Sequence, residues 1–250
     1  MKLVNLVTVA ALSATILAGG ATVFAKEERK VQTQGEVKFI PNIDEVAVVI
    51  PPETKPEVVI PPVVPSTGPL TITYAPSMNF GEQSISNQDQ TYNMLAEMQE
   101  LTDGSGPTPY VSFAQVQDTR GNNEGWALSV TVSEFTSGTQ NGTLTGAQLS
   151  LLNPAINYAG NTSSNAPTSH ASTLSLVPGA ATTIMEAVQG KGAGTSSVVW
   201  GDQVALNNST DAEVRNDAIQ LFVPGTTAKD ATTYTADLSW ELTATPANKP

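Results

Sequence analysis

Strict alternation of apolar and polar side chains near the C-terminal end constrains the fold more than any other feature. Residues 234–244 place Tyr, Ala, Leu, Trp, Leu and Ala at even positions and Thr, Asp, Ser, Glu and Thr at odd positions. Successive side chains of a strand point to opposite faces, so this period of two predicts a strand with one buried face and one solvated face. Such half-buried strands are typical of antiparallel sheets.

The same period recurs upstream, where Trp126, Leu128, Val130 and Val132 share one strand face. Turn-forming stretches separate further Thr-rich and apolar runs, which predict strands at residues 70–74, 110–116, 148–152, 172–176 and 219–223. One segment, residues 93–101, has near-helical spacing of Met and Leu, and we expect a helix there, with strands as the alternative. Together these patterns predict an all-β fold, either an antiparallel β-sandwich or a barrel-like domain.

The first 25 residues have the pattern of a secretory signal peptide. Lys2 precedes a mostly apolar run to Leu17, and small residues at Val23 and Ala25 suit cleavage before Lys26. A transmembrane anchor is the alternative, but Thr, Ser and Gly interrupt the run, and about 20 apolar residues are needed to span a bilayer. We therefore expect an exported chain with no membrane span after cleavage.

Residues 26–69 are charged and then rich in proline, which predicts a disordered linker or extended stalk ahead of a folded domain at residues 70–250. A short imperfect repeat, residues 48–53 and 58–63, supports a polyproline-like spacer. A proline-rich ligand for a partner domain is the alternative.

Composition excludes several classes of function. The net charge of −12 and the pI of about 4.3 leave no cationic surface for nucleic acid. The absence of cysteine excludes disulfides, thiolate metal sites and cysteine nucleophiles.

No pattern in the chain predicts catalysis, a metal or a cofactor. The single histidine, His170, has no neighbouring acid at triad-like spacing. Asp211, Glu213 and Asp217 lack the glycine and the terminal glutamate of a calcium loop, and a solvated acidic loop is the simpler interpretation. Residues 190–195 are rich in glycine but precede a strand-like run, which favours a turn over a phosphate loop. We expect a protein that is not an enzyme.

Two Trp-x-Leu motifs lie within matching strand patterns. The first is Gly125-Trp126-Ala127-Leu128-Ser129-Val130, preceded by Asp118-Thr119-Arg120-Gly121, and the second is Tyr234-Thr235-Ala236-Asp237-Leu238-Ser239-Trp240-Glu241-Leu242. With these motifs the sequence resembles the WxL-domain surface proteins of low-GC Gram-positive bacteria. The resemblance implies a secreted protein held non-covalently at the cell wall through peptidoglycan or an associated wall polymer, often assembled with other surface proteins. It places the cell-wall-binding motif on Trp126, Leu128, Trp240 and Leu242.

An indole suits two roles, because its flat face stacks on sugar rings and its large area dominates a core. Since each Trp lies on the apolar face of its strand, packing is favoured, and the motif then marks the fold more than its contact surface. Two other functions stay open: an adhesin or complex subunit that binds mainly proteins through edge strands or the stalk, and a wall hydrolase.

Overall fold

The computed structural model describes residues 32–244 except 42, 45, 62–66 and 161. The chain divides into two compact units, residues 1–38 and 39–250. In the first unit the described residues, 32–38, form no helix or strand and are exposed. The expected signal peptide, residues 1–25, lies outside the described residues. In the described part of the chain, no helix is long and apolar enough to cross a membrane.

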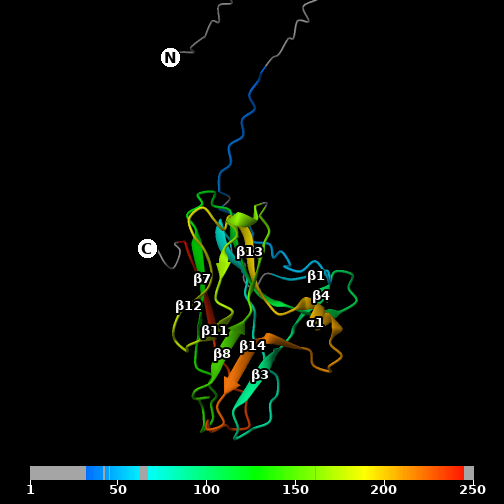
Figure 1. The fold of residues 1–250 in the computed structure, drawn as a ribbon, viewed down its shortest axis with the longest axis vertical. Coiled ribbons are helices and arrows are strands. Elements are labelled where there is room, and N and C mark those ends of the chain that lie inside the picture. Colours follow the sequence, from blue (N-terminus) through cyan, green and yellow to red (C-terminus); the bar gives the residue numbers. More distant parts are fainter. Residues whose placement is uncertain (1–31, 42, 45, 62–66, 161, 245–250) are drawn as a thin grey trace, which may run out of the picture. The chain divides into compact units, whose positions relative to one another are not determined.

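Three four-stranded antiparallel sheets form the body of the second unit (Figure 1). The first has the order β2 (Leu70–Tyr74), β6 (Ser112–Asp118), β13 (Gly194–Trp200) and β9 (Ala155–Tyr158). The second has the order β10 (Thr168–Ser169), β12 (Thr182–Ala187), β7 (Trp126–Val132) and β15 (Leu238–Thr243). The third has the order β11 (Thr173–Leu176), β8 (Gln148–Leu152), β14 (Arg215–Val223) and β3 (Gln90–Leu95). The prediction of an all-β antiparallel fold is confirmed.

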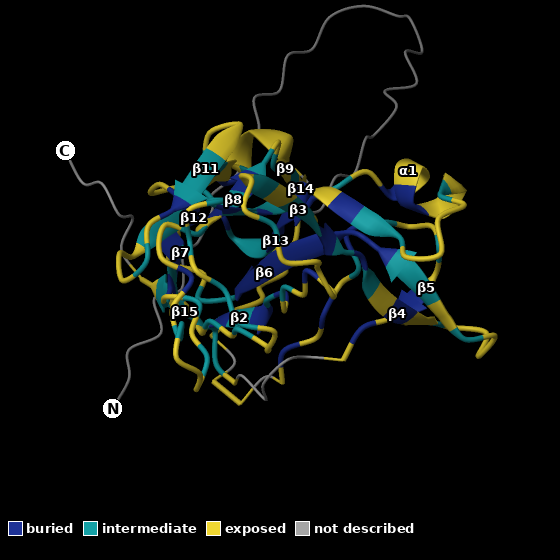
Figure 2. Cartoon of the chain, turned by 90° about the horizontal axis from the view of Figure 1, so that it is seen from below, coloured by how far each residue is buried: buried dark blue, intermediate teal, exposed yellow. Residues whose placement is uncertain are grey.

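The three sheets surround one hydrophobic core. Each contributes side chains that are fully buried, among them Val198 from the first sheet, Leu128 from the second and Leu151 from the third. Viewed from below, the sheets form a ring around this buried interior, with β15 and β2 as neighbours (Figure 2). The alternation read from the sequence at β7 and β15 is therefore the result of a sheet burying one face in this core. The first sheet differs, because β6 is buried on both faces, one in this core and the other in a second apolar cluster that contains Phe113 and Val199.

A smaller sheet flanks this body. It has the order β1 (Val58–Val59), β4 (Glu97–Leu101) and β5 (Pro107–Tyr110), and packs near the one α-helix of the described residues, α1 (Gln203–Asn208). Asp202 caps α1, since its side chain accepts from two backbone N–H groups of the first turn. One short 3₁₀ helix, Ser163–Asn165, follows β9.

Part of the proline-rich segment packs with the domain, where the sequence predicted an exposed stalk. Ala47, Val49 and Val58 are almost fully buried, and Val58–Val59 pairs with β4. The backbone N–H of Ile50 donates to Oε1 of Gln115 at 2.9 Å, and Nε2 of Gln115 donates back to the carbonyl of Ile50 at 2.6 Å. Proline blocks a regular ladder but not pairing at a sheet edge or with a side-chain amide, so the stalk expectation is wrong for residues 46–60.

Residues 93–101 form parts of two strands and not the expected helix. The chain leaves β3 at Leu95, changes sheet at the buried Ala96 and continues as β4. The N–H of Ala96 donates to the carbonyl of Val214 at 2.9 Å. Two short strands joined by this change of direction produce the spacing that imitates a helix.

The strands predicted at residues 70–74 and 148–152 are confirmed with identical bounds, as β2 and β8, and those at 172–176 and 219–223 are confirmed as β11 and β14. The strand predicted at residues 110–116 is confirmed only from Ser112, as part of β6, because Tyr110 ends β5 in another sheet. The final strand is shorter than its alternation suggested. β15 begins at Leu238, and upstream of it Thr235 makes an isolated bridge with Thr136.

Candidate functional site

The fold brings the two Trp-x-Leu motifs together on neighbouring strands. β7 and β15 pair antiparallel, so that Leu242 lies opposite Leu128 and Trp240 lies opposite Val130. Residues separated by more than 100 positions in the sequence thus share one sheet face, although the two indoles differ in their surroundings.

Trp126 is a core residue. Its side chain is completely buried, and its Nε1 donates to the carbonyl of Gly192 at 3.0 Å. Glycine is required at that position because a Cβ there would lie 2.6 Å from Nε1 of Trp126 and the backbone has φ +77. The glycine-rich turn at residues 190–195 therefore packs against the indole of Trp126.

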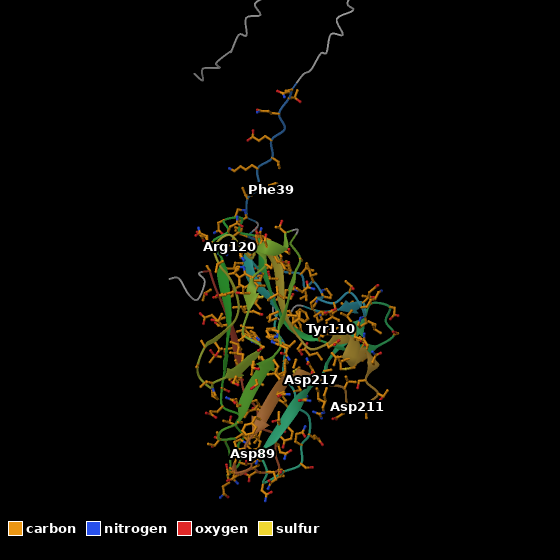
Figure 3. All side chains as sticks on the ribbon, in the orientation of Figure 1. Phe39, Asp89, Tyr110, Arg120, Asp211 and Asp217 are labelled. Carbon is orange, nitrogen blue, oxygen red and sulfur yellow. The ribbon has the colours of Figure 1, made fainter. Side chains whose placement is uncertain are left out.

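The residues before the first motif fix its entry into the sheet. Gly125 has φ +82, and a Cβ there would lie 2.2 Å from the carbonyl oxygen of Ala187 on β12. The Arg120 guanidinium forms two bonds to the Asp118 carboxylate, at 2.9 and 2.8 Å, and its Nη2 also donates to the carbonyl of Gly125 at 2.8 Å. The hydrogen bonds to Asp118 raise the pKa of the Arg120 guanidinium above its usual value. Arg120 lies at the end of the sheets opposite to Asp89 (Figure 3).

Trp240 is only partly buried. It packs against the edge of the core together with Leu238 and Leu242, while Ser239 and Glu241 point outward and are exposed. The second indole therefore lies at the surface of the core and not inside it.

Trp240 lines an open groove between two sheets, which we call the β2–β15 groove. Its volume is about 760 Å³. One wall is formed by Thr67, Leu70–Ile72 and Ala75–Met78, and the other by Ala236–Leu238, Trp240 and Leu242. In the described structure β2 and β15 are each the outermost strand of a sheet, and both line this groove. The sequence predicted the strand at Leu70–Ile72 from its alternation, but it did not predict that this strand lines a groove.

Three residues anchor the chain where it approaches β15. The Tyr234 hydroxyl donates to the carbonyl of Asn141 at 2.7 Å and accepts from the N–H of Asp230 at 2.9 Å. Asn141 donates to both carboxylate oxygens of Asp230, and these bonds hold the pKa of that carboxyl below its ordinary value. Tyr234, the first residue of the second motif, is thus held in place four residues before β15 begins.

The outer side of the same sheet carries a row of hydroxyl groups. Ser239 lies opposite Thr131, and Ser129 lies between Glu241 on β15 and Thr183 on β12. All five are half-buried or exposed. We call this surface the hydroxyl face. It is the solvated counterpart of the face that carries the motif residues.

The described residues contain no cluster of His, Cys, Asp and Glu able to hold a metal. Nε2 of His170 accepts from Nε1 of Trp200 at 2.9 Å, and burial lowers the pKa of the imidazole. Among the acids weighed for calcium, Glu213 pairs with Arg215 at 2.7 Å, and Asp211 and Asp217 are exposed (Figure 3). His170 and Glu213 are thus engaged in contacts with neighbouring side chains.

A family model described as WxL domain, surface cell wall-binding, matches residues 26–246. The chain therefore belongs to the WxL family, and it is a cell-wall-binding protein of the cell surface. The match begins well upstream of residue 70, in agreement with the packing of residues 46–60 on the domain. A search of curated proteins and a search of solved structures each gave no match.

Proposed function

We propose that this protein attaches to the wall by binding peptidoglycan, and that the hydroxyl face makes the contact. The orientation of the motifs carries this proposal. The four motif residues all point toward the core side of their sheet: Trp126, Leu128, Trp240 and Leu242. In our proposal these residues stabilise the sheet, and its opposite face binds the polymer.

The chemistry of the hydroxyl face suits a glycan. Thr131, Ser239 and their neighbours each supply a donor and an acceptor, which match the hydroxyl and acetamido groups of amino sugars. The carboxylate of Glu241 accepts from amide N–H groups or pairs with ammonium groups of the peptide stems. Short side chains on a sheet give a surface that contacts several sugar rings, and many weak contacts add up on a repetitive polymer.

Charge favours peptidoglycan over the phosphodiester polymers of the wall. The chain carries a net charge of −12, and an anionic polymer would be repelled by it. An acidic protein binds more readily to a polymer that is recognised through hydroxyl and amide groups.

The test is co-sedimentation of the purified chain with protein-stripped walls, before and after chemical removal of the phosphodiester polymers. The triple variant Thr131→Ala, Ser239→Ala, Glu241→Ala removes three contacts, and we expect binding at least about tenfold weaker. Equal binding by this variant would contradict the proposal, as would binding that disappears with the phosphodiester polymers.

A matched control lies on the outer face of the third sheet. Ser175, Ser150 and Gln220 are directly opposed on β11, β8 and β14, and the two serine hydroxyls are 3.1 Å apart. The triple alanine variant at these positions removes similar polar groups and is expected to bind walls like the parent chain. The same incubations are assayed for soluble muropeptides, and their release would establish hydrolysis in place of binding.

A further inference from the structure

The small sheet of β1, β4 and β5 has one face against the domain and one face outside it. The side chains of Val58 and Tyr110 point inward and belong to the second apolar cluster. Successive residues of a strand point to opposite faces, and directly opposed residues share a face. The strand register therefore assigns five side chains to the outer face, which we call the lobe face: Val59, Met98, Glu100, Pro107 and Pro109.

The lobe face is mostly apolar and open to solvent. Val59 is 56% exposed and Met98 is 55% exposed, and Glu100 and Pro107 are also exposed. The outer faces of the second and third sheets carry serine, threonine, glutamine and glutamate instead. Apolar side chains that are neighbours on a sheet and exposed together, with polar groups around them, are typical of a surface that binds another protein.

The arrangement of these side chains suits a basic residue that has apolar neighbours. Glu100 lies between Val59 and Pro107 in the strand register, and Met98 is two residues away on the same strand. When a partner covers such a carboxylate, the local dielectric constant falls and the ion pair becomes stronger than in water. The aliphatic stem of a lysine or arginine also packs well on apolar neighbours.

The charge around the lobe face favours the same kind of partner. We define the acidic lobe as this sheet, α1 and the adjoining loops, residues 53–60, 97–110 and 202–214. These 35 residues carry eight acidic side chains and one basic one, whereas the other 215 residues carry 15 acidic and ten basic ones. Two of the eight acids form ion pairs, Glu57 and Glu213. The lobe therefore attracts a basic segment and repels a second copy of this acidic chain.

We propose that the lobe face binds a partner protein through a segment that presents a lysine or arginine flanked by apolar side chains. The basic side chain pairs with Glu100, and its apolar neighbours cover Val59 and Met98. Three strands span about 10 Å, so the face accommodates several residues of a partner and is larger than a single ammonium group. The strands of the hydroxyl face, β7, β12 and β15, lie on the other side of the ring of sheets from β4 and β5 (Figure 2). One chain then binds the wall and the partner at the same time, which goes beyond the proposed function.

The first test measures the binding of three labelled nine-residue peptides to the exported chain, residues 26–250, by fluorescence anisotropy. The valine–lysine peptide has a central lysine, a valine two residues to either side and serine elsewhere. In the second peptide serine replaces both valines, and in the third glutamate replaces the lysine. We expect the first peptide to bind with a Kd below about 1 mM, at least about fivefold tighter than the other two. Absence of binding would overturn the proposal, as would equal binding of either altered peptide.

Variants of the chain locate the contact. Glu100→Gln should weaken binding of the valine–lysine peptide by about fivefold or more, and so should the double variant Val59→Ser, Met98→Ser. Ile85→Ser and Asp217→Asn are the matched controls, because both residues are exposed and lie outside the acidic lobe. All five positions are exposed, and unchanged melting temperatures are the check on folding. Equal losses in the control variants, or no loss in the lobe variants, would contradict the proposal.

Two further measurements distinguish the partner protein from other occupants. Light scattering of the parent chain over a concentration series is expected to show a monomer, and association that the double variant abolishes would assign the face to a second copy instead. The double variant is expected to co-sediment with walls like the parent, and a loss of wall binding would assign the face to the polymer. Either result overturns this proposal. The triple alanine variant of the hydroxyl face should still bind the peptide, so the two proposals fail independently.

Discussion

Replacing each motif tryptophan by alanine should have unequal effects on the free energy of unfolding. Trp126 is completely buried, and truncation of a buried aromatic side chain costs about 3–5 kcal/mol. The substitution also leaves the carbonyl of Gly192 without its donor, which adds to the cost if water does not reach it. Trp126→Ala should therefore lie near the upper end of this range, at about 4–5 kcal/mol. Trp240 is only partly buried, and Trp240→Ala should cost about 1–2 kcal/mol.

Urea unfolding measures the difference, with far-UV circular dichroism and the emission of the remaining tryptophans as two signals. A loss of 4 kcal/mol corresponds to a melting temperature lower by roughly 10 °C in a domain of this size. Trp126→Phe keeps part of the ring and loses the Nε1 bond, so its cost should fall between the two alanine variants. Equal costs for Trp126→Ala and Trp240→Ala would refute the assignment of one indole to the core and the other to the groove.

Two further predictions concern the residues before the first motif and the half-buried acid Glu97. Gly125→Ala should destabilise the fold by several kcal/mol, because the added Cβ would lie 2.2 Å from a backbone oxygen. Gly121 has a similar φ of +71 but no atom near the position of a Cβ, so Gly121→Ala should cost only about 1 kcal/mol of backbone strain. Equal melting temperatures for the two variants would contradict this. Burial raises the pKa of Glu97 from 4.5 to about 7, so the folded chain keeps a proton that the unfolded chain loses. Stability should fall by about 3 kcal/mol as the pH rises from 4.5 to 7, and it should show no such slope in Glu97→Gln. A parent chain whose unfolding free energy is constant over that range would exclude a raised pKa.

The strands that face the common core were predictable from the sequence because burial on one face imposes a period of two. β2, β7 and β8 follow from that period alone. Where the environment changes within a segment, the period fails. Residues 93–101 pass from one sheet to another at Ala96, and the resulting pattern resembled a helix. α1 was not predicted, since six residues are too few for a helical repeat to show.

The proline-rich segment shows a second limit of sequence reasoning. Proline excludes a central strand, and that inference holds, because β1 lies at the edge of its sheet. The burial of Val49 and Val58 depends instead on a second apolar cluster, in which Tyr74 and Phe113 stack with ring centroids 4.3 Å apart. That cluster is assembled from distant parts of the chain, and its position is not encoded in the composition of residues 46–60.

The sequence by itself determined the all-β class, the strand faces of both motifs and membership of a wall-binding family, because these depend on local periodicity and on short motifs. Only the tertiary structure decided which tryptophan is enclosed. Trp126 lies on an interior strand, β7, between β12 and β15, whereas Trp240 lies on β15 at the edge of the sheet. Identical local patterns acquire different burial when one strand has neighbours on both sides and the other has a neighbour on one side only. The edge position of β15 and the groove beside it are consequences of strand order, which depends on pairing between residues far apart in the chain.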